Sequence, residues 1–204
     1  MSKTQKYDMI LDALQSLLEQ KDIQTISVSE IAQTAGIGKG SIYYYFPSKD
    51  AMLEALVERS YEKPLLTAKH LADQTEISPF TRMAMIFQAC HSSSLEFRKS
   101  DHTSSAANAP ENAYIHQKFL NHLITELKPT LTRIISQGIE DGLIDFDNPE
   151  ALSENALIVL AVKIDNTLVR STPEEIHQTI QGLVSLMERG TGNPEGTLNF
   201  LKIL

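Results

Sequence analysis

The sequence predicts an all-α protein of about nine helices, with a three-helix head at the N-terminus and a larger helical bundle after it. Apolar residues recur at helical spacing in almost every segment, and no segment alternates apolar and polar residues as a half-buried strand does. Helix start and stop signals recur along the chain as capping boxes, prolines at first helical positions and glycines after last turns. With 204 residues, 42% of them hydrophobic, the chain can build both parts.

The first three helices are predicted from spacing and capping. Residues 3–20 place an apolar stripe along one side of an amphipathic helix. Ser27 and Glu30 have the spacing of a capping box, so a second, short helix starts at Ser27 and stops at Gly36. A third helix starts around Gly38 or Lys39 and ends before Pro47, because the residue that precedes a proline is disfavoured in a helix.

The later helices are longer. Ser48 caps a helix that runs to Pro64 or continues beyond it with a kink. Residues 100–112 are small and polar, which indicates a loop or one short helical turn. The other helices are predicted over residues 79–99, 112–141 (with a possible kink at Pro129), 149–170 and 173–189.

The last two of these helices indicate a dimer. Residues 150–169 carry apolar residues on more than one face, so more than one face must be covered. Residues 173–189 add a second apolar stripe. Two such helices per subunit predict a four-helix interface with two-fold symmetry, about residues 150–170 and 173–189. The alternative is that both helices are internal core.

Composition excludes several classes of protein. Cys90 is the one cysteine, so no internal disulfide forms and a reducing, cytoplasmic setting is expected. The N-terminus lacks the pattern of a signal peptide, and no apolar run is long enough for a membrane span. The six histidines form no metal-binding motif, and no nucleophile or phosphate-loop motif occurs. We therefore expect no enzyme activity, metal or cofactor.

The charge distribution bears on a nucleic-acid partner. A net charge of −8 argues against one, because attraction to phosphate dominates non-specific binding. However, residues 31–49 carry Lys39 and Lys49 and no acidic residue. A sequence-specific DNA-binding protein needs only a few phosphate contacts, some of which neutral donors can supply.

Residues 27–46 have the pattern of a helix-turn-helix motif. The alternative is an ordinary helical hairpin that serves only packing. Against it, the second helix begins with Gly38, Gly40 and Ser41, which are poor choices for packing but allow close approach to another surface. A lysine in the first turn opposes the helix dipole unless an anionic partner is present. The three consecutive tyrosines spread around the helix, so at least one points outward.

The stretch "TISVSEIAQTAGIGKGSIYYYFPSKDAMLEAL", residues 25–56, resembles the DNA-binding signature of TetR-family transcriptional regulators. The matching features are Ile-Ala in the first motif helix, Ala-Gly at the turn, "KGSIY" opening the second helix, and an aromatic run followed by "PSK". Two features depart from the family pattern. Gly38 stands where a serine or threonine cap is usual, and "EQKDIQT" replaces the usual glycine after the first helix.

The resemblance implies a DNA-binding domain over residues 1–47 and an effector-binding and dimerisation domain over residues 48–204. Tyr43, Tyr45 and Lys49 fall at positions that grip phosphate in the family. Members of the family reach base edges or nearby backbone in the major groove from four further positions. In this chain these positions hold Lys39, Gly40, Ser41 and Tyr44. Ser27 falls where a hydroxyl often meets phosphate.

An effector site is predicted among the long helices. The candidate lining residues are Phe87, Cys90, Ser94, Phe119, His122 and Asp165. Each also has a structural interpretation: core aromatic, small buried residue, or satisfied polar group. Asp165 with Asn166 interrupts a nearly apolar segment, and a buried carboxylate needs a partner. The pair is expected to serve either a network at the dimer interface or a ligand contact.

The resemblance implies a homodimeric, sequence-specific repressor. A small, mostly apolar effector would release it from a pseudo-palindromic operator of double-stranded DNA by changing the spacing of the two heads. The alternative is a DNA-binding protein of the same fold without an effector, acting as a chromosome-organising protein or a constitutive regulator.

Overall fold

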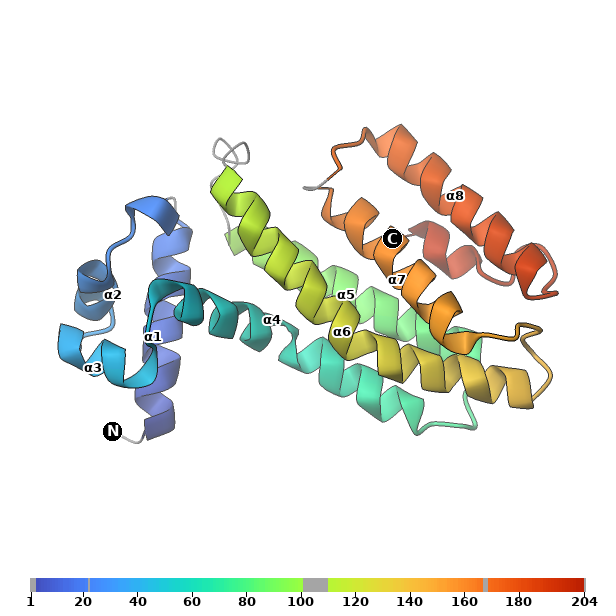
Figure 1. Ribbon diagram of the computed structural model, residues 1–204, viewed down its shortest axis with the longest axis horizontal. Helices are drawn as coiled ribbons and strands as arrows, with labels where there is room; N and C mark the ends of the chain where they lie inside the picture. Colours follow the sequence, from blue (N-terminus) through green and yellow to red (C-terminus); the bar gives the residue numbers. More distant parts are fainter. Residues whose placement is uncertain (1–2, 22, 101–109, 167–168, 204) are drawn as a thin grey trace. The chain divides into compact units, whose positions relative to one another are not determined.

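The computed structural model describes residues 3–21, 23–100, 110–166 and 169–203; within these ranges, side chains are described except at 94–100, 110–116, 119, 164, 165 and 203. Every regular element in the described residues is helical, which confirms the all-α prediction (Figure 1). The chain forms two compact units. Unit 1 comprises Met1–Ser60 and Leu95–Phe119, and unit 2 comprises Tyr61–Ser94 and Leu120–Leu204.

Unit 1 is built on the first three helices and the start of a fourth. These elements are α1 (Lys3–Leu18), the 3-10 turn η1 (Ile23–Thr25), α2 (Val28–Thr34), α3 (Lys39–Tyr45) and the first half of α4 (Lys49–Ala72). α2 packs against both α1 and α3. The apolar stripe of α1 supplies much of the core, with Ile10, Leu11 and Leu14 fully buried. This core holds the short α2 and α3 in place, since helices of seven residues are not stable alone.

The turn between α2 and α3 depends on Gly36. Its φ of 67° lies in the left-handed region, which costs other residues strain. Its N–H donates to the Gln33 carbonyl at 3.1 Å, and the Ile37 N–H donates to the Ala32 carbonyl at 3.0 Å. These two bonds form a Schellman motif, which ends α2 and directs the chain into α3.

Unit 2 contains the second part of α4 and the longer helices. These are α5 (Pro79–Ser100) and α6 (Pro110–Glu140), both of which extend into the ranges of unit 1, then α7 (Pro149–Asp165), α8 (Pro173–Gly190) and the 3-10 turn η2 (Asn199–Ile203). α8 packs against α7 and η2. The helix starts predicted at Pro79, Pro149 and Pro173 are confirmed, and α4 continues through Pro64.

One predicted helix is too long. We expected the helix beginning at residue 149 to reach about Arg170, but α7 ends at Asp165. Asn166 adopts a left-handed conformation with φ 54° and caps the helix. Its side chain donates to the Ser171 carbonyl at 3.0 Å and accepts from the Ser171 N–H at 2.7 Å. The apolar residues Leu168 and Val169 continue the helical pattern of the sequence past Asn166, so the pattern does not indicate that the helix ends there.

Among the described side chains of unit 2, two charged ones, Arg82 and Glu188, are buried. The guanidinium of Arg82 donates from Nη1 to Gln137 Oε1 at 2.5 Å and to the Ala72 carbonyl at 3.4 Å, so it joins α5, α6 and the end of α4. Burial lowers the pKa of Arg82. The negative charges of two nearby carboxylates, Asp141 and Glu76, act in the opposite direction and raise it. Glu188 Oε1 accepts from the N–H groups of Gly196 and Leu198, each at 2.9 Å, and thereby ties the C-terminal segment to α8.

Candidate nucleic-acid interface

The start of α2 is held by a complete capping box. The Glu30 N–H donates to Ser27 Oγ at 3.2 Å, and the Ser27 N–H donates to Glu30 Oε2 at 2.9 Å, as the sequence predicts. Because Ser27 Oγ acts here as an acceptor, its own O–H proton remains available to an outside acceptor. The side chain is exposed, so a phosphate oxygen could accept that proton.

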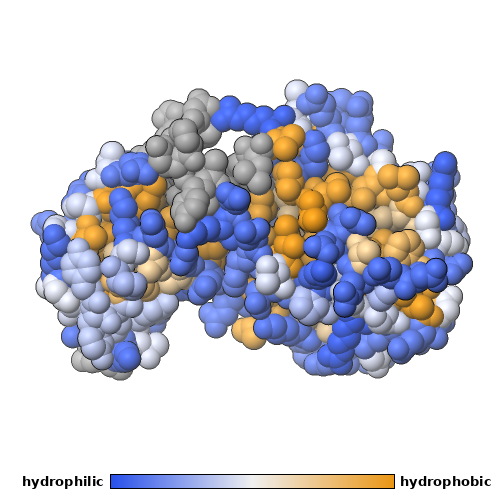
Figure 2. Space-filling model, in the orientation of Figure 1, coloured by the Kyte–Doolittle hydropathy of each residue, from blue (hydrophilic) through white to orange (hydrophobic). Residues whose placement is uncertain are grey.

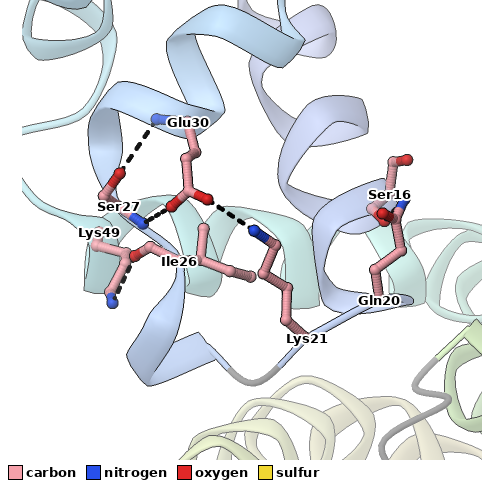
Figure 3. A network of polar contacts seen from close by, with 7 residues as sticks. All are labelled: Ser16, Gln20, Lys21, Ile26, Ser27, Glu30 and Lys49. Carbon is pink, nitrogen blue, oxygen red and sulfur yellow. Dashed lines mark hydrogen bonds and ion pairs between the residues drawn. The ribbon is translucent and has the colours of Figure 1, made fainter.

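Glu30 also makes an ion pair that the sequence does not reveal. Its Oε1 lies 2.6 Å from Lys21 Nζ, and Figure 3 shows Lys21 reaching it from the segment between α1 and α2. The hydrogen bond from Lys21, with that from the Ser27 backbone, lowers the pKa of Glu30 to about 2. This contact stabilises the "EQKDIQT" turn, in which the family's usual glycine is absent.

Lys49 belongs to the same polar network but binds the protein itself. Its Nζ donates to the carbonyl oxygens of Ile23 and Ile26, at 2.6 and 3.0 Å. Figure 3 shows Lys49 beneath the start of α2, close to Ser27. We expected Lys49 at a phosphate; in the structure, two of the three N–H bonds of its ammonium group point inward and one is left for such a contact.

The two faces of α3 have opposite character. Ile42 is fully buried and Phe46, just after the helix, is 3% exposed, so the inner face is fixed to the core of unit 1. On the outer face, Tyr43 is 52% exposed and Tyr44 is 71% exposed. Tyr45 is half-buried. The prediction that at least one tyrosine points outward is confirmed, and two do.

The first turn of α3 is slender and open. Gly38 caps the helix without a side-chain bond, as its lack of a hydroxyl implies. A Cβ placed at Gly38 or Gly40 would have no other atom within 4 Å. Packing within the protein therefore does not require glycine at either position. Lys39 is exposed beside them, and Ser41 is partly exposed.

Aromatic contacts join α1 to the region of α3. The rings of Tyr7 and Phe46 lie 4.7 Å apart between centroids, and those of Tyr44 and Tyr45 meet edge to face at 5.1 Å. Burial is the main cause that raises the pKa of Tyr7. Lys3 Nζ lies 5.6 Å from the ring centroid of Tyr44, within the range of a cation–π interaction. Sequence spacing does not indicate this contact, since it joins two helices that are far apart along the chain.

The candidate effector residues lie partly outside the described side chains. Phe87 and Cys90 share one face of α5 and are each 8% exposed. Burial raises the pKa of Cys90 to about 12, so its thiol stays protonated and unreactive. His122, on α6, is half-buried. The side chains of Ser94, Phe119 and Asp165 lie outside the described residues.

The described part of the chain offers neither a metal site nor a membrane span. It contains no cluster of three or more His, Cys, Asp or Glu residues placed to hold a metal ion. None of its helices has both the length and the apolar character needed to cross a membrane.

The capped helix α2, the Schellman turn and the short helix α3 together form a helix-turn-helix motif. The inner face of α3 is buried, and its outer face presents exposed tyrosines. This arrangement is typical of DNA-binding regulators. Family comparison agrees: residues 10–56 match the bacterial regulatory proteins of the tetR family, and residues 98–184 match the tetracyclin repressor-like C-terminal domain. The chain belongs to the TetR family of transcriptional regulators.

The similar proteins span several roles. The transcriptional regulator EthR of Mycobacterium tuberculosis (strain H37Rv) is 38% identical over 64 residues, 31% of this chain and 30% of EthR. The nucleoid occlusion factor SlmA of Serratia proteamaculans is 34% identical over 85 residues, 41% of this chain and 42% of SlmA. The matches thus span less than half the length of these relatives. The crystal structure of RolR with its ligand resorcinol has the same fold, with a TM-score of 0.64 at 18% identity over 97% of this chain and 93% of RolR.

Proposed function

We propose that this protein is a sequence-specific repressor that inserts α3 into the major groove of a pseudo-palindromic operator. The observation that carries the proposal is the two-sided character of α3, with Ile42 buried and Tyr43 and Tyr44 exposed. Lys39, Gly40, Ser41 and Tyr44 are proposed to reach bases or nearby backbone. Ser27, Tyr43, Tyr45 and the remaining N–H bond of Lys49 are proposed to hold phosphates.

We propose that residues 1–47 form the DNA-binding domain and that residues 48–204 form the effector-binding and dimerisation domain. Exposed apolar side chains on α7 and α8 support a homodimer through these helices, because a partner subunit would cover them. Ile158 on α7 is 44% exposed and Leu186 on α8 is 72% exposed. Figure 2 shows apolar side chains gathered on the visible surface of unit 2. Access to chromosomal DNA implies a cytoplasmic protein, and the proposal assigns it no catalytic activity or cofactor.

A small, mostly apolar effector is proposed to bind in unit 2 near Phe87 and Cys90, both buried on one face of α5. The ligand resorcinol in the RolR complex supports this class of effector. Binding would change the spacing of the two DNA-binding heads, which must match the roughly 34–36 Å repeat of the major groove.

The test is selection of DNA from a random pool by the full-length protein, followed by a mobility-shift assay on the selected duplex and on the DNA upstream of its own gene. We expect a palindromic motif with two half-sites. Failure to enrich any motif at low salt would overturn the operator proposal.

The dimer has a test of its own. The double variant Ile158→Glu, Leu186→Glu should yield a monomer in sedimentation analysis, because it places carboxylates on the proposed apolar interface. Gln181→Glu is the control, since it adds a carboxylate at an exposed polar position on a different side of α8. A double variant that sediments as the wild-type protein does would contradict this interface.

The similarity to SlmA favours a second candidate, a chromosome-organising DNA-binding protein without an effector. Chromatin immunoprecipitation separates the two. A repressor should occupy a few promoters, and a chromosome-organising protein should occupy many dispersed sites.

A further inference from the structure

The positive charge available to DNA on unit 1 is smaller than the sequence suggests. Ion pairs join Lys21 to Glu30, Arg59 to Asp12 and Lys118 to Glu54. Lys49 keeps its charge, but two of the three N–H bonds of its ammonium group are used on carbonyl oxygens, which leaves one for an outside acceptor. Among the described side chains of unit 1, the cations left without such a partner are Lys3, Lys6 and Lys39.

Two of these three lysines flank the exposed face of α3. Lys39 is the first residue of α3 and is exposed. Lys3 is the first residue of α1, but its ammonium group lies over the ring of Tyr44, near the other end of α3. Figure 1 shows α1 beginning at the side of unit 1 where α3 lies. Tyr44 is the most exposed aromatic residue on that helix, so the Lys3 ammonium stands at the outer surface.

We propose that Lys3 is a further DNA-contacting residue, which binds a backbone phosphate beside the groove entered by Tyr44. This inference rests on the proposed placement of α3 in the major groove. DNA presents a phosphate about every 3.4 Å along each strand, so a cation beside an inserted residue meets the backbone. The Tyr44 ring holds the Lys3 side chain through the cation–π interaction, which lowers the entropy that the lysine loses when it becomes ordered on DNA.

The contact would link recognition to the start of α1. Lys3 adds a positive charge beside Tyr44, near the end of α3. Tyr44 would then serve both as a groove contact and as a support for Lys3. The effect of removing Lys3 should therefore depend on the aromatic ring at position 44. It should not depend on the DNA sequence, because phosphates carry no sequence information directly.

The test compares Lys3→Gln with Lys63→Gln, which makes the same charge change at an exposed lysine of unit 2. The probes are the duplex selected by the wild-type protein and a scrambled duplex of the same composition. Fluorescence anisotropy gives the affinity for each from about 50 to 300 mM salt, the range in which phosphate binding changes steeply. The slope of log affinity against log salt is negative, and Lys3→Gln should make it less steep by about 0.9 for each phosphate that is no longer neutralised. The variant should weaken binding to both duplexes alike. Lys63→Gln should leave the slope unchanged.

A second arm tests the role of the ring. In a Tyr44→Phe background, Lys3→Gln should have its full effect, and in a Tyr44→Leu background the effect should shrink. A Lys3→Gln slope equal to the wild-type slope, or to that of Lys63→Gln, overturns the inference.

Two further variants test the proposed function separately. If Lys39→Gln and Tyr43→Phe weaken binding while Lys3→Gln does not, only the role of Lys3 is wrong. If none of the three weakens binding, the placement of α3 itself is wrong. Equal melting temperatures show that the variants are folded.

Discussion

The ammonium nitrogen of Lys49 lies 2.6 Å from the carbonyl oxygen of Ile23, 26 residues earlier in the chain. This bond, with the second one to Ile26, attaches the start of α4 to the segment that leads into α2. A residue whose position in the family indicates a phosphate contact therefore also supports the helix-turn-helix motif from inside.

Replacing Lys49 should accordingly affect folding as well as DNA binding. We expect Lys49→Met, which keeps the apolar stem, to lower the free energy of unfolding by about 1–2 kcal/mol, because two carbonyl oxygens are left without their charged donor. Urea unfolding followed by tyrosine fluorescence measures this, since Tyr7, Tyr43, Tyr44 and Tyr45 are four of the six tyrosines. Lys63→Met is the matched control. DNA affinity should fall equally for all sequences, and a changed base preference would contradict the phosphate role.

Acid should weaken the network around Glu30. Its pKa is about 2 in the folded protein, against an ordinary value of 4.5, so the unfolded chain binds more protons between these two pH values. The stabilising contribution is complete above pH 4.5 and is lost as the pH falls toward 2. In Glu30→Gln, unfolding measured by urea at several pH values should depend less steeply on pH in this window.

The matched comparison is Glu175, in the capping box of α8. Its pKa is also lowered, chiefly by the hydrogen bond from the Thr172 backbone. Glu175→Gln should reduce the acid dependence in the same direction without affecting the tyrosine signal of unit 1. If Glu30→Gln leaves the pH profile of that signal unchanged, the contacts of the Glu30 carboxylate with Lys21 and Ser27 contribute no pH-dependent stability.

Gly40 offers a variant in which stability and DNA binding should change in opposite directions. The space where its Cβ would lie is open, so Gly40→Ala should keep or raise stability, by up to about 1 kcal/mol. The added methyl group should nevertheless reduce affinity for the selected duplex, because it lies on the surface with which α3 is proposed to approach DNA. Thermal unfolding and anisotropy measure the two effects.

Gly36→Ala is the contrasting variant. Its site is also open, but φ is 67°, so alanine should destabilise the protein by about 1 kcal/mol through backbone strain alone. Unchanged DNA affinity in Gly40→Ala would show that the first turn of α3 does not need to be slender.

Glu188 should control the order of the C-terminal segment. Glu188→Ala leaves the buried N–H of Leu198 and that of Gly196 without an acceptor and should cost about 2–3 kcal/mol. Faster hydrogen exchange at these two amides is the direct readout. Glu195→Ala, at a neighbouring exposed position, should change neither quantity.

Local sequence patterns determined much of this protein. The predicted capping box at Ser27, the proline starts at residues 79, 149 and 173, and the glycine stop at residue 36 each act within a few residues, so spacing alone predicts them. The buried Ile42 and Phe46 and the outward tyrosines follow from helical periodicity in the same way.

Contacts between distant residues were decided only by the tertiary structure. Lys49 on the Ile23 carbonyl, Lys21 on Glu30 and Lys3 over Tyr44 join side chains from different elements, and no periodicity records such pairs. These contacts determine which lysines are free to meet DNA and which already bind groups of the protein. The net charge of the chain does not show this difference. The sequence therefore predicts the helix that is proposed to meet DNA. Which lysine side chains lie beside that helix is determined by the packing of distant segments.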